Sequence, residues 1–248
     1  MLAETLRFLL TGSSALVMHN SRLVDPLDPW SREIAAITGK RHKTIADHEQ
    51  LAKAEFYGSA WLDHDRPCIP ATVIEGLLVT AAKTRRRGSQ ARSGIVCPAH
   101  VCLTYDGPET LDGLWKDERF RLRIPVRTPG GRVMRTRPLF PEWRAEVEVK
   151  FLSSLVDAEA VEGWFRLGGE LLGIGDFRPR HGRFSVERLP VVSPIESVSV
   201  GSGRAGQASA RQGSVGSAGE EYVAPLPSSE HPKRKRKTRD GPATDSAR

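Results

Sequence analysis

Cysteine is scarce in this chain of 248 residues, which contains three, and no two of them form a C-x-x-C pair. An odd and scattered set of thiols supports neither a disulfide framework nor a zinc site, and it fits a reducing compartment. Long apolar runs are lacking too, because the run at residues 8–10 is cut short by polar residues and glycine. Such a run is too short for a signal peptide or a membrane span. We therefore expect a cytoplasmic protein that makes no membrane contact.

Signature motifs of the common enzyme classes are also missing. The chain contains no H-E-x-x-H, no P-loop, no kinase signature and no G-x-S-x-G. The pair Gly173-x-Gly175 resembles part of a dinucleotide fingerprint, but it follows an expected helix, whereas that fingerprint follows a strand. The sequence therefore predicts no cofactor.

The histidines provide only isolated candidates for a metal-binding or catalytic role. The seven histidines show no metal-binding spacing, and the aspartates Asp63 and Asp65 around His64 fit a turn as well as a metal site. His42 and His181 lie among basic residues, so they are the candidates if the chain cleaves RNA by general acid–base chemistry. The leading hypothesis includes no catalytic residue and no metal.

Charge divides the chain into two parts. The net charge is +7, and the segment 190–248 holds nine Lys and Arg against six Asp and Glu, so it carries +3 and residues 1–189 carry +4. The segment 190–248 has too little apolar surface to offset the entropy of ordering. We expect a nucleic-acid-binding domain at 1–189 and a disordered basic tail at 190–248. The run 233–237 is either a nuclear localisation signal, in a eukaryote, or an arm for nucleic acid in a bacterial or phage protein.

Basic residues are clustered in the folded part. Clustered cations on a basic domain favour a polyanionic partner, most simply single-stranded RNA or DNA. For residues 85–87 the alternative is a cationic cap at a helix C-terminus, where positive charge complements the helix dipole. The candidate binding residues are Lys40, Arg41, Lys43, Arg85, Arg86, Arg87, Arg132, Arg135, Arg137, Gly173, Gly175, Arg178, Arg180, His181 and Arg183.

The last of these clusters is a glycine–arginine loop at residues 173–183. Its glycines at 173, 175 and 182 permit positive φ and are expected to leave backbone amides open. Its three arginines supply planar guanidinium donors, which suit phosphate. The alternative is a tight connection from a helix to a strand whose arginines are merely solvated.

Hydrophobic periodicity predicts six main elements. They are strands at 5–10, 101–105, 143–151 and 183–188, and helices at 71–83 and 157–172. This β-α-β-β-α-β order predicts an α+β fold with a ferredoxin-like core. Two insertions interrupt the core. Residues 11–68 hold expected helices at 31–38 and 45–57, and residues 106–140 hold an arginine-rich hairpin that turns at 129–131.

These features together resemble a known family. A ferredoxin-like core, a helix that starts with IPATVIEG at residues 69–76 and a Gly-rich basic loop before the last strand resemble the RAMP superfamily. Within it the resemblance is to the CRISPR backbone subunits that polymerise along guide RNA, and it covers residues 1–189. It implies RNA binding by the loop, an inserted thumb-like hairpin that reaches a neighbouring subunit, and a role in antiviral defence. Proteins of this general appearance also occur in phages and prophages.

The sequence thus leads to one hypothesis with two alternatives. We expect a non-catalytic protein that binds single-stranded nucleic acid, RNA in preference to DNA, as a repeating subunit of a ribonucleoprotein with other subunits. The central strands carry no plain aromatic pair, so base stacking of the RRM kind is not expected. One alternative is a metal-independent ribonuclease on the same fold. The other is a structural or assembly protein of viral origin that uses its arginines for subunit contacts.

Overall fold

The computed structural model describes residues 3–190, all of which belong to one compact unit of the chain. Within this range the expected α+β class is confirmed, because helices and strands are mixed along the chain and the strands form several sheets. No helix in residues 3–190 has the length and apolar composition needed to cross a membrane. The tail expected at 190–248, with its basic run at 233–237, lies outside the described residues apart from Pro190.

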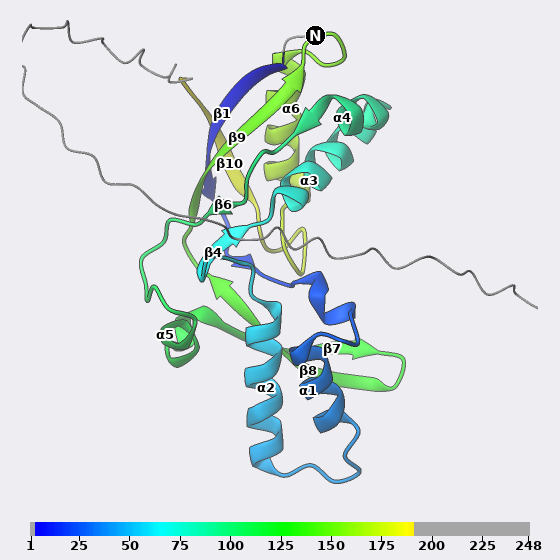
Figure 1. Cartoon of the computed structure of the whole chain (residues 1–248), viewed down its shortest axis with the longest axis vertical. Helices are drawn as coiled ribbons and strands as arrows, with labels where there is room; N and C mark the ends of the chain where they lie inside the picture. The colour runs from blue at the N-terminus through cyan, green and yellow to red at the C-terminus, as the bar shows by residue number, and fades with distance from the viewer. Residues whose placement is uncertain (1–2, 191–248) are drawn as a thin grey trace, which may run out of the picture. The chain divides into compact units, whose positions relative to one another are not determined.

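The central sheet has four strands in the order β10-β1-β9-β5, and each neighbouring pair is antiparallel (Figure 1). The strands are β1 (Ala3–Gly12), β5 (Ile95–Val96), β9 (Arg144–Leu152) and β10 (Phe184–Leu189). Along β1 every second side chain is buried, so Leu6, Phe8 and Leu10 share one face. The three long strands confirm those expected from the alternation of apolar and polar residues.

Helices cover the buried face of this sheet (Figure 1). They are α3 (Ala71–Lys83), the short α4 (Gly88–Gly94), and α6 (Ala158–Leu167), which continues into a π-helical turn (Gly168–Leu172). Phe165 of α6 packs against Phe8 of β1, with ring centroids 4.6 Å apart. At Gly168 a Cβ would lie 2.9 Å from the Leu77 side chain, so glycine allows α3 and α6 to approach closely. Both long helices begin and end close to the expected positions.

The strand expected at 101–105 is present only in part, because residues 101–102 are a strand and Thr104 makes a single antiparallel bridge to Arg144 of β9. The edge position beside β9 is occupied by β5, and the chain leaves the sheet near Pro98, which has no amide to donate. The apolar residues that follow form β6 (Val101–Cys102), which pairs with β4 (Arg66–Ile69), and β4 in turn pairs with β3 (Leu62–Asp63). A short apolar run cannot indicate by itself which sheet it joins.

The first insertion contains the two expected helices. Its elements are β2 (Leu16–Val17), a 3₁₀ turn (Ser21–Val24), α1 (Pro29–Thr38) and α2 (Ile45–Ser59). Asp28 caps α1 through its carboxylate, and Thr44 with Asp47 forms a complete capping box at the start of α2. These local hydrogen bonds explain why both helices begin within two residues of the expected positions.

The second insertion contains the expected hairpin. It comprises α5 (Leu111–Lys116), a 3₁₀ turn (Glu118–Phe120), β7 (Arg121–Thr128) and β8 (Gly131–Phe140). The end of β8 pairs with β2, where Leu16 lies opposite Phe140, and α2 packs against β8. The two insertions therefore share one structural unit, although they lie far apart in the sequence (Figure 1).

We predict that Gly182→Ala lowers the free energy of unfolding by about 2 kcal/mol or more. Gly182 has φ +75°, and a Cβ there would overlap the carbonyl oxygen of Ile174. Chemical denaturation of the full chain measures this loss.

Gly163→Ala is the matched control, because Gly163 lies inside α6 and a Cβ there meets nothing within 4 Å. Alanine should raise stability at this position by up to about 1 kcal/mol through its higher helix propensity. Equal stability of the two variants would contradict the close backbone packing of the loop.

Candidate nucleic-acid interface

Backbone amides of the glycine–arginine loop (residues 173–183) donate hydrogen bonds within the loop and to residues 15–17. The amide of Ile174 donates to Gly182 at 2.9 Å, that of Asp176 to Val17 at 2.8 Å and that of Gly182 to Ala15 at 2.8 Å. At Gly175, where φ is +85°, a Cβ would overlap the carbonyl oxygen of Val17. The expectation that the glycines leave amides open is therefore wrong for these positions. The glycines allow the loop to pack on itself and on residues 15–17.

The basic side chains of this loop differ in the contacts that they make within the chain. Arg178 and Arg180 are exposed, and neither takes part in the ion pairs found within residues 3–190. Arg183 is exposed as well, but its Nε donates to the carbonyl of Pro179 at 2.8 Å and its amide donates to Ser14. The ring of His181 lies edge-on to Phe177, with centroids 6.4 Å apart. Two arginines of the loop thus remain available for a phosphate.

An ion cluster in which Glu55 and Arg137 are buried joins α2, β8 and the loop. Glu55 of α2 is 3% exposed, and its carboxylate accepts hydrogen bonds from Arg135 Nη1 at 2.5 Å and from the Thr136 amide at 2.8 Å. Arg137, which is 7% exposed, donates to Asp176 of the loop at 3.3 Å and to the Thr136 carbonyl at 3.1 Å. Arg135 and Arg137, both expected to bind nucleic acid, therefore hold α2, β8 and the loop together.

Asp176 is the acidic member of this cluster on the loop side. Burial by itself would raise the pKa of Asp176, but the hydrogen bond from His19, the Phe177 amide and the charge of Arg137 outweigh it and lower the pKa. Burial lowers the pKa of the Arg137 guanidinium, and the carboxylates of Glu55 and Asp176 oppose that shift. The cluster therefore stabilises the ionised form of Asp176.

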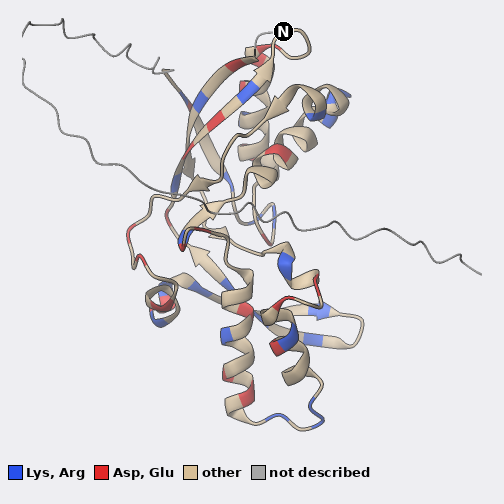
Figure 2. Ribbon diagram, viewed as in Figure 1, with Lys and Arg blue, Asp and Glu red and all other residues tan. Residues whose placement is uncertain are grey.

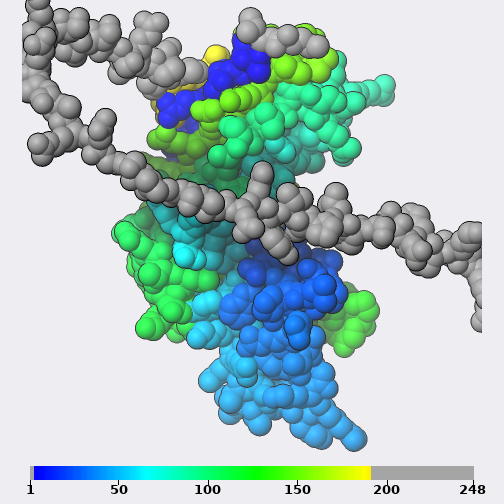
Figure 3. Space-filling view, in the orientation of Figure 1, coloured from blue at the N-terminus to red at the C-terminus, as the bar shows by residue number. Residues whose placement is uncertain are grey.

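A groove between α2 and the β7–β8 hairpin gathers basic side chains from both insertions. This basic groove has a volume of about 490 Å³ and is lined by Lys43 from the α1–α2 loop, Arg123 from β7, and Arg132 and Arg135 from β8. Its only carboxylate is that of Glu55, which the buried cluster already engages. Figure 2 shows basic residues on the hairpin and on the loop that joins α1 to α2. In the space-filling view the green hairpin tip emerges beside the blue surface of the first insertion (Figure 3).

The remaining candidates lie outside the basic groove. Lys40 forms an ion pair with Asp47 of the capping box, while Arg41 is exposed in the same loop. Arg85 and Arg86 are exposed at the end of α3. Arg87 is held by the fold, because its guanidinium lies over the Trp164 ring at 5.5 Å, pairs with Asp157 and bonds to Gln90.

The structure therefore brings some of the expected binding residues together in one groove and places the others elsewhere. Lys43, Arg132 and Arg135 come together in the basic groove, whereas residues 85–87 occupy the α3–α4 connection. Arg123 is not in the expected set. The alternation along β7, with arginine at 121, 123 and 127, is the signal that places it on the polar face of the strand.

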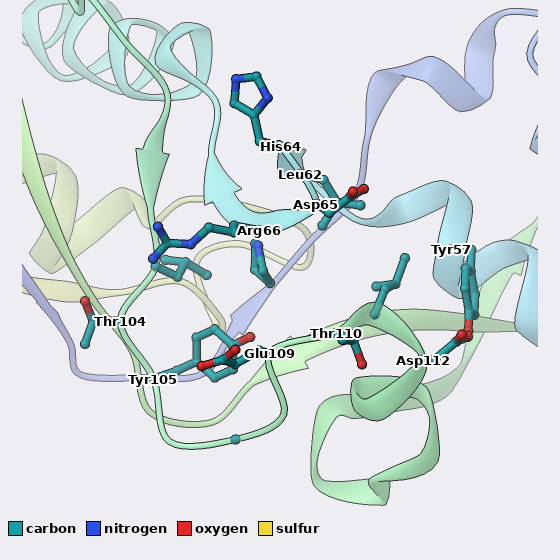
Figure 4. Close-up of a pocket in the computed structure, with 14 residues that line it drawn as sticks. Tyr57, Leu62, His64, Asp65, Arg66, Thr104, Tyr105, Glu109, Thr110 and Asp112 are labelled. Atoms are coloured by element: carbon teal, nitrogen blue, oxygen red, sulfur yellow. The ribbon is translucent and has the colours of Figure 1, made fainter.

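A second recess, which the sequence did not reveal, lies beside the β3–β4 turn (Figure 4). This polar recess has a volume of about 780 Å³, and its acidic and basic lining residues are His64, Asp65, Arg66, Glu109 and Asp112. Tyr57 donates its hydroxyl to Asp112, and burial, followed by that contact, raises the pKa of Tyr57. Three carboxylates against one arginine make this recess unsuited to phosphate.

The turn interpretation of Asp63, His64 and Asp65 is consistent with the backbone. His64 and Asp65 connect β3 to β4 and have φ values of 46° and 64°, as a two-residue hairpin turn of type I′ requires. Within residues 3–190 no group of three or more His, Cys, Asp or Glu side chains is placed to hold a metal ion.

The open face of the central sheet does not resemble a stacking platform. Its side chains on β1 and β9 are Thr5, Arg7, Leu9, Thr11, Arg144, Glu146, Glu148 and Lys150. None of these is aromatic, and Arg7 is paired with Glu146 at 3.0 Å. Glu146 and Glu148 offset two of the three cations on this face, so its net charge is smaller than that of the basic groove.

No protein-family model matches the chain, and no curated protein is similar to it in sequence.

Glu55→Gln should lower the free energy of unfolding by about 1.5–3 kcal/mol, the range for hydrogen bonds that involve charged groups. The amide can accept from Thr136 but carries no charge for Arg135 and Arg137. Urea denaturation measures the loss. Glu49→Gln, at an exposed position of the same helix, should change stability by no more than about 0.5 kcal/mol. Similar losses in both variants would contradict the importance of the buried cluster.

Asp176 should make stability depend on pH. Because its pKa is lowered in the folded state, its contribution is fully present above the unfolded pKa of about 4 and is lost as pH falls through the folded pKa. Asp176→Asn should therefore be less stable than the parent at pH 7, and the difference should shrink by pH 3. The comparison with the parent cancels the effect of Asp28 and Asp117, whose pKa values are also lowered. A constant difference over this range would exclude the ionised carboxylate as the cause.

Proposed function

We propose that the chain is a non-catalytic protein that binds single-stranded nucleic acid, RNA in preference to DNA, with backbone phosphates in the basic groove. The observation that carries this proposal is the convergence of Lys43, Arg123 and Arg132 from three separate elements on one groove. Together with Arg135 they give four positive charges against the one of Glu55, so the groove carries a net +3. Guanidinium and ammonium groups at this density suit a chain of phosphates.

The apolar part of the groove supports a nucleic acid over a simple anion. Leu51 of α2 and Val133 and Met134 of β8 lie among the basic side chains, and Met134 is 44% exposed. Riboses and bases can pack on such side chains while phosphates contact the cations. The loop arginines Arg178 and Arg180 are proposed as a second contact, because the Asp176–Arg137 pair fixes their loop against β8.

The resemblance to the RAMP superfamily stays a proposal, and so does the ferredoxin-like core. The sheet order β10-β1-β9-β5 supports the core, because it interleaves two β-α-β units, one through α3 and one through α6. The inserted hairpin and the Gly-rich loop before the last strand support the family. On this reading the protein is a repeating subunit along a nucleic-acid strand, and it associates with itself and with other subunits.

A structural or assembly role is the second candidate, because the internal use of arginine weakens the argument for nucleic acid. Arg87, Arg135, Arg137 and Arg183 all bond within the chain. Fewer arginines are therefore free for a phosphate backbone than the sequence suggests. Sizing the protein with and without RNA separates the two roles, because an assembly protein associates without nucleic acid.

Replacing Lys43, Arg123 and Arg132 together by Ala should weaken binding of single-stranded RNA by about tenfold or more, since one charge-assisted hydrogen bond contributes about 1.5–3 kcal/mol. The slope of log K against log salt should become shallower by about 2, because each phosphate contact contributes about −0.7. Fluorescence anisotropy at several salt concentrations measures both effects, and the melting temperature should change little because none of the three residues belongs to the buried cluster.

The charge-matched control replaces Arg7, Arg144 and Lys150 on the open face of the sheet by Ala. It removes the same charge and should leave affinity within about twofold of the parent, since those side chains make no groove contact. Equal losses in both triple variants would mean that net charge alone attracts RNA, which would contradict a binding groove.

Recovery of intact RNA after incubation, with and without EDTA, tests the ribonuclease alternative, and cleavage would replace our proposal by that one.

A further inference from the structure

Two cysteines lie directly opposite each other where β4 pairs with β6. Cys68 and Cys102 are register partners, and in the adjacent pair the Leu103 amide donates to the Pro67 carbonyl at 2.9 Å. Hydrogen-bonded and non-hydrogen-bonded pairs alternate along an antiparallel ladder, so Cys68 and Cys102 form a non-hydrogen-bonded pair. In such a pair the Cα atoms are about 4.5 Å apart and the two side chains share one face. Disulfides span Cα separations of about 4.4–6.8 Å.

The two thiols differ in accessibility. Both are free thiols, Cys68 is fully buried and Cys102 is partly exposed. Burial raises the pKa of Cys68 to about 12, and the neighbouring Asp63 and Cys102 add to that shift. Cys102 is thus the thiol that a small oxidant in solution reaches first.

The third cysteine has different surroundings. Cys97 is buried near the sheet edge, and its Sγ lies 3.5 Å from the carbonyl oxygens of Ala99 and Glu148. It has no cysteine as its register partner, since the strand that precedes it pairs with β9. Cys97 therefore serves as an internal control for thiol oxidation, because no cysteine lies opposite it.

We propose that Cys68 and Cys102 are an oxidation site that forms a cross-strand disulfide with a peroxide. The Cys102 sulfur attacks the peroxide O–O bond and becomes a sulfenic acid, and one water leaves when the oxidant is hydrogen peroxide. The Cys68 sulfur then attacks the Cys102 sulfur, the S–O bond breaks and a second water carries away the hydroxyl group with the Cys68 proton. Two electrons pass from the two thiols to the peroxide.

The disulfide would join β4 and β6, the two strands that form one wall of the polar recess. Arg66 and Pro67 precede Cys68, Leu103 and Thr104 follow Cys102, and all four residues line the recess. The new bond locks the pairing of β4 with β6 and so fixes this wall. The site is independent of the proposed nucleic-acid groove, whose lining residues are others.

The test treats the full-length protein with hydrogen peroxide, blocks remaining thiols by alkylation and maps cross-linked peptides by mass spectrometry. We expect a peptide pair joined through Cys68 and Cys102 with the loss of two hydrogen atoms, and a fall from three reactive thiols to one in denaturant. Dithiothreitol should reverse both changes. Cys97→Ser should behave like the parent, whereas Cys68→Ala and Cys102→Ser should each abolish the cross-link.

Other products would overturn the proposal. Cys102 converted to sulfinic or sulfonic acid without a cross-link would show that Cys68 does not reach it. A disulfide through Cys97, or one between two chains, would show that the pairing of β4 with β6 does not direct the reaction. The mapping in the parent protein does not depend on the folding of any variant.

Discussion

The buried carboxylate of Glu55 is the constraint on which the inserted part of the structure depends. A carboxylate that is 3% exposed is costly unless charge and hydrogen bonds compensate it, and Arg135 and the Thr136 amide supply both. The same strand places Arg137 against Asp176, so the cluster reaches the glycine–arginine loop. One set of ionic contacts thus positions a helix, a hairpin and a loop that come from distant parts of the chain.

This cluster divides the arginines into two groups with different roles. Arg135 pairs with the buried carboxylate of Glu55, Arg137 pairs with the partly buried carboxylate of Asp176, and Arg87 packs over an indole ring, so these side chains stabilise the fold. Lys43, Arg123 and Arg132 line the basic groove without an ion pair among the described residues, although the Lys43 ammonium donates to the Lys40 carbonyl at 2.8 Å, so their charges are not neutralised within the described part of the chain. Our functional proposal rests on the second group. It does not rest on the total number of basic residues.

The basic groove exists only because the two insertions pack on each other. Lys43 precedes α2 in the first insertion, whereas Arg123 and Arg132 belong to the hairpin of the second, and the contact of α2 with β8 brings them together. The central sheet supplies the framework from which both insertions emerge. Its own open face carries both acidic and basic residues on β1 and β9, and those strands lack the outward aromatic side chains that base stacking requires.

Alternation, helical periodicity and capping residues such as Thr44 and Asp47 act within a few residues, so the α+β class, most helices and strands, and the hairpin follow from local sequence. The basic clusters are visible in the sequence as well. The pairing of residues 101–102 with β4, the hydrogen bonds of the loop amides, and the position of Lys43 beside Arg123 and Arg132 appear only in the folded chain. Such pairings depend on contacts between residues far apart in the chain, and the local pattern of one segment cannot predict which distant segment it contacts.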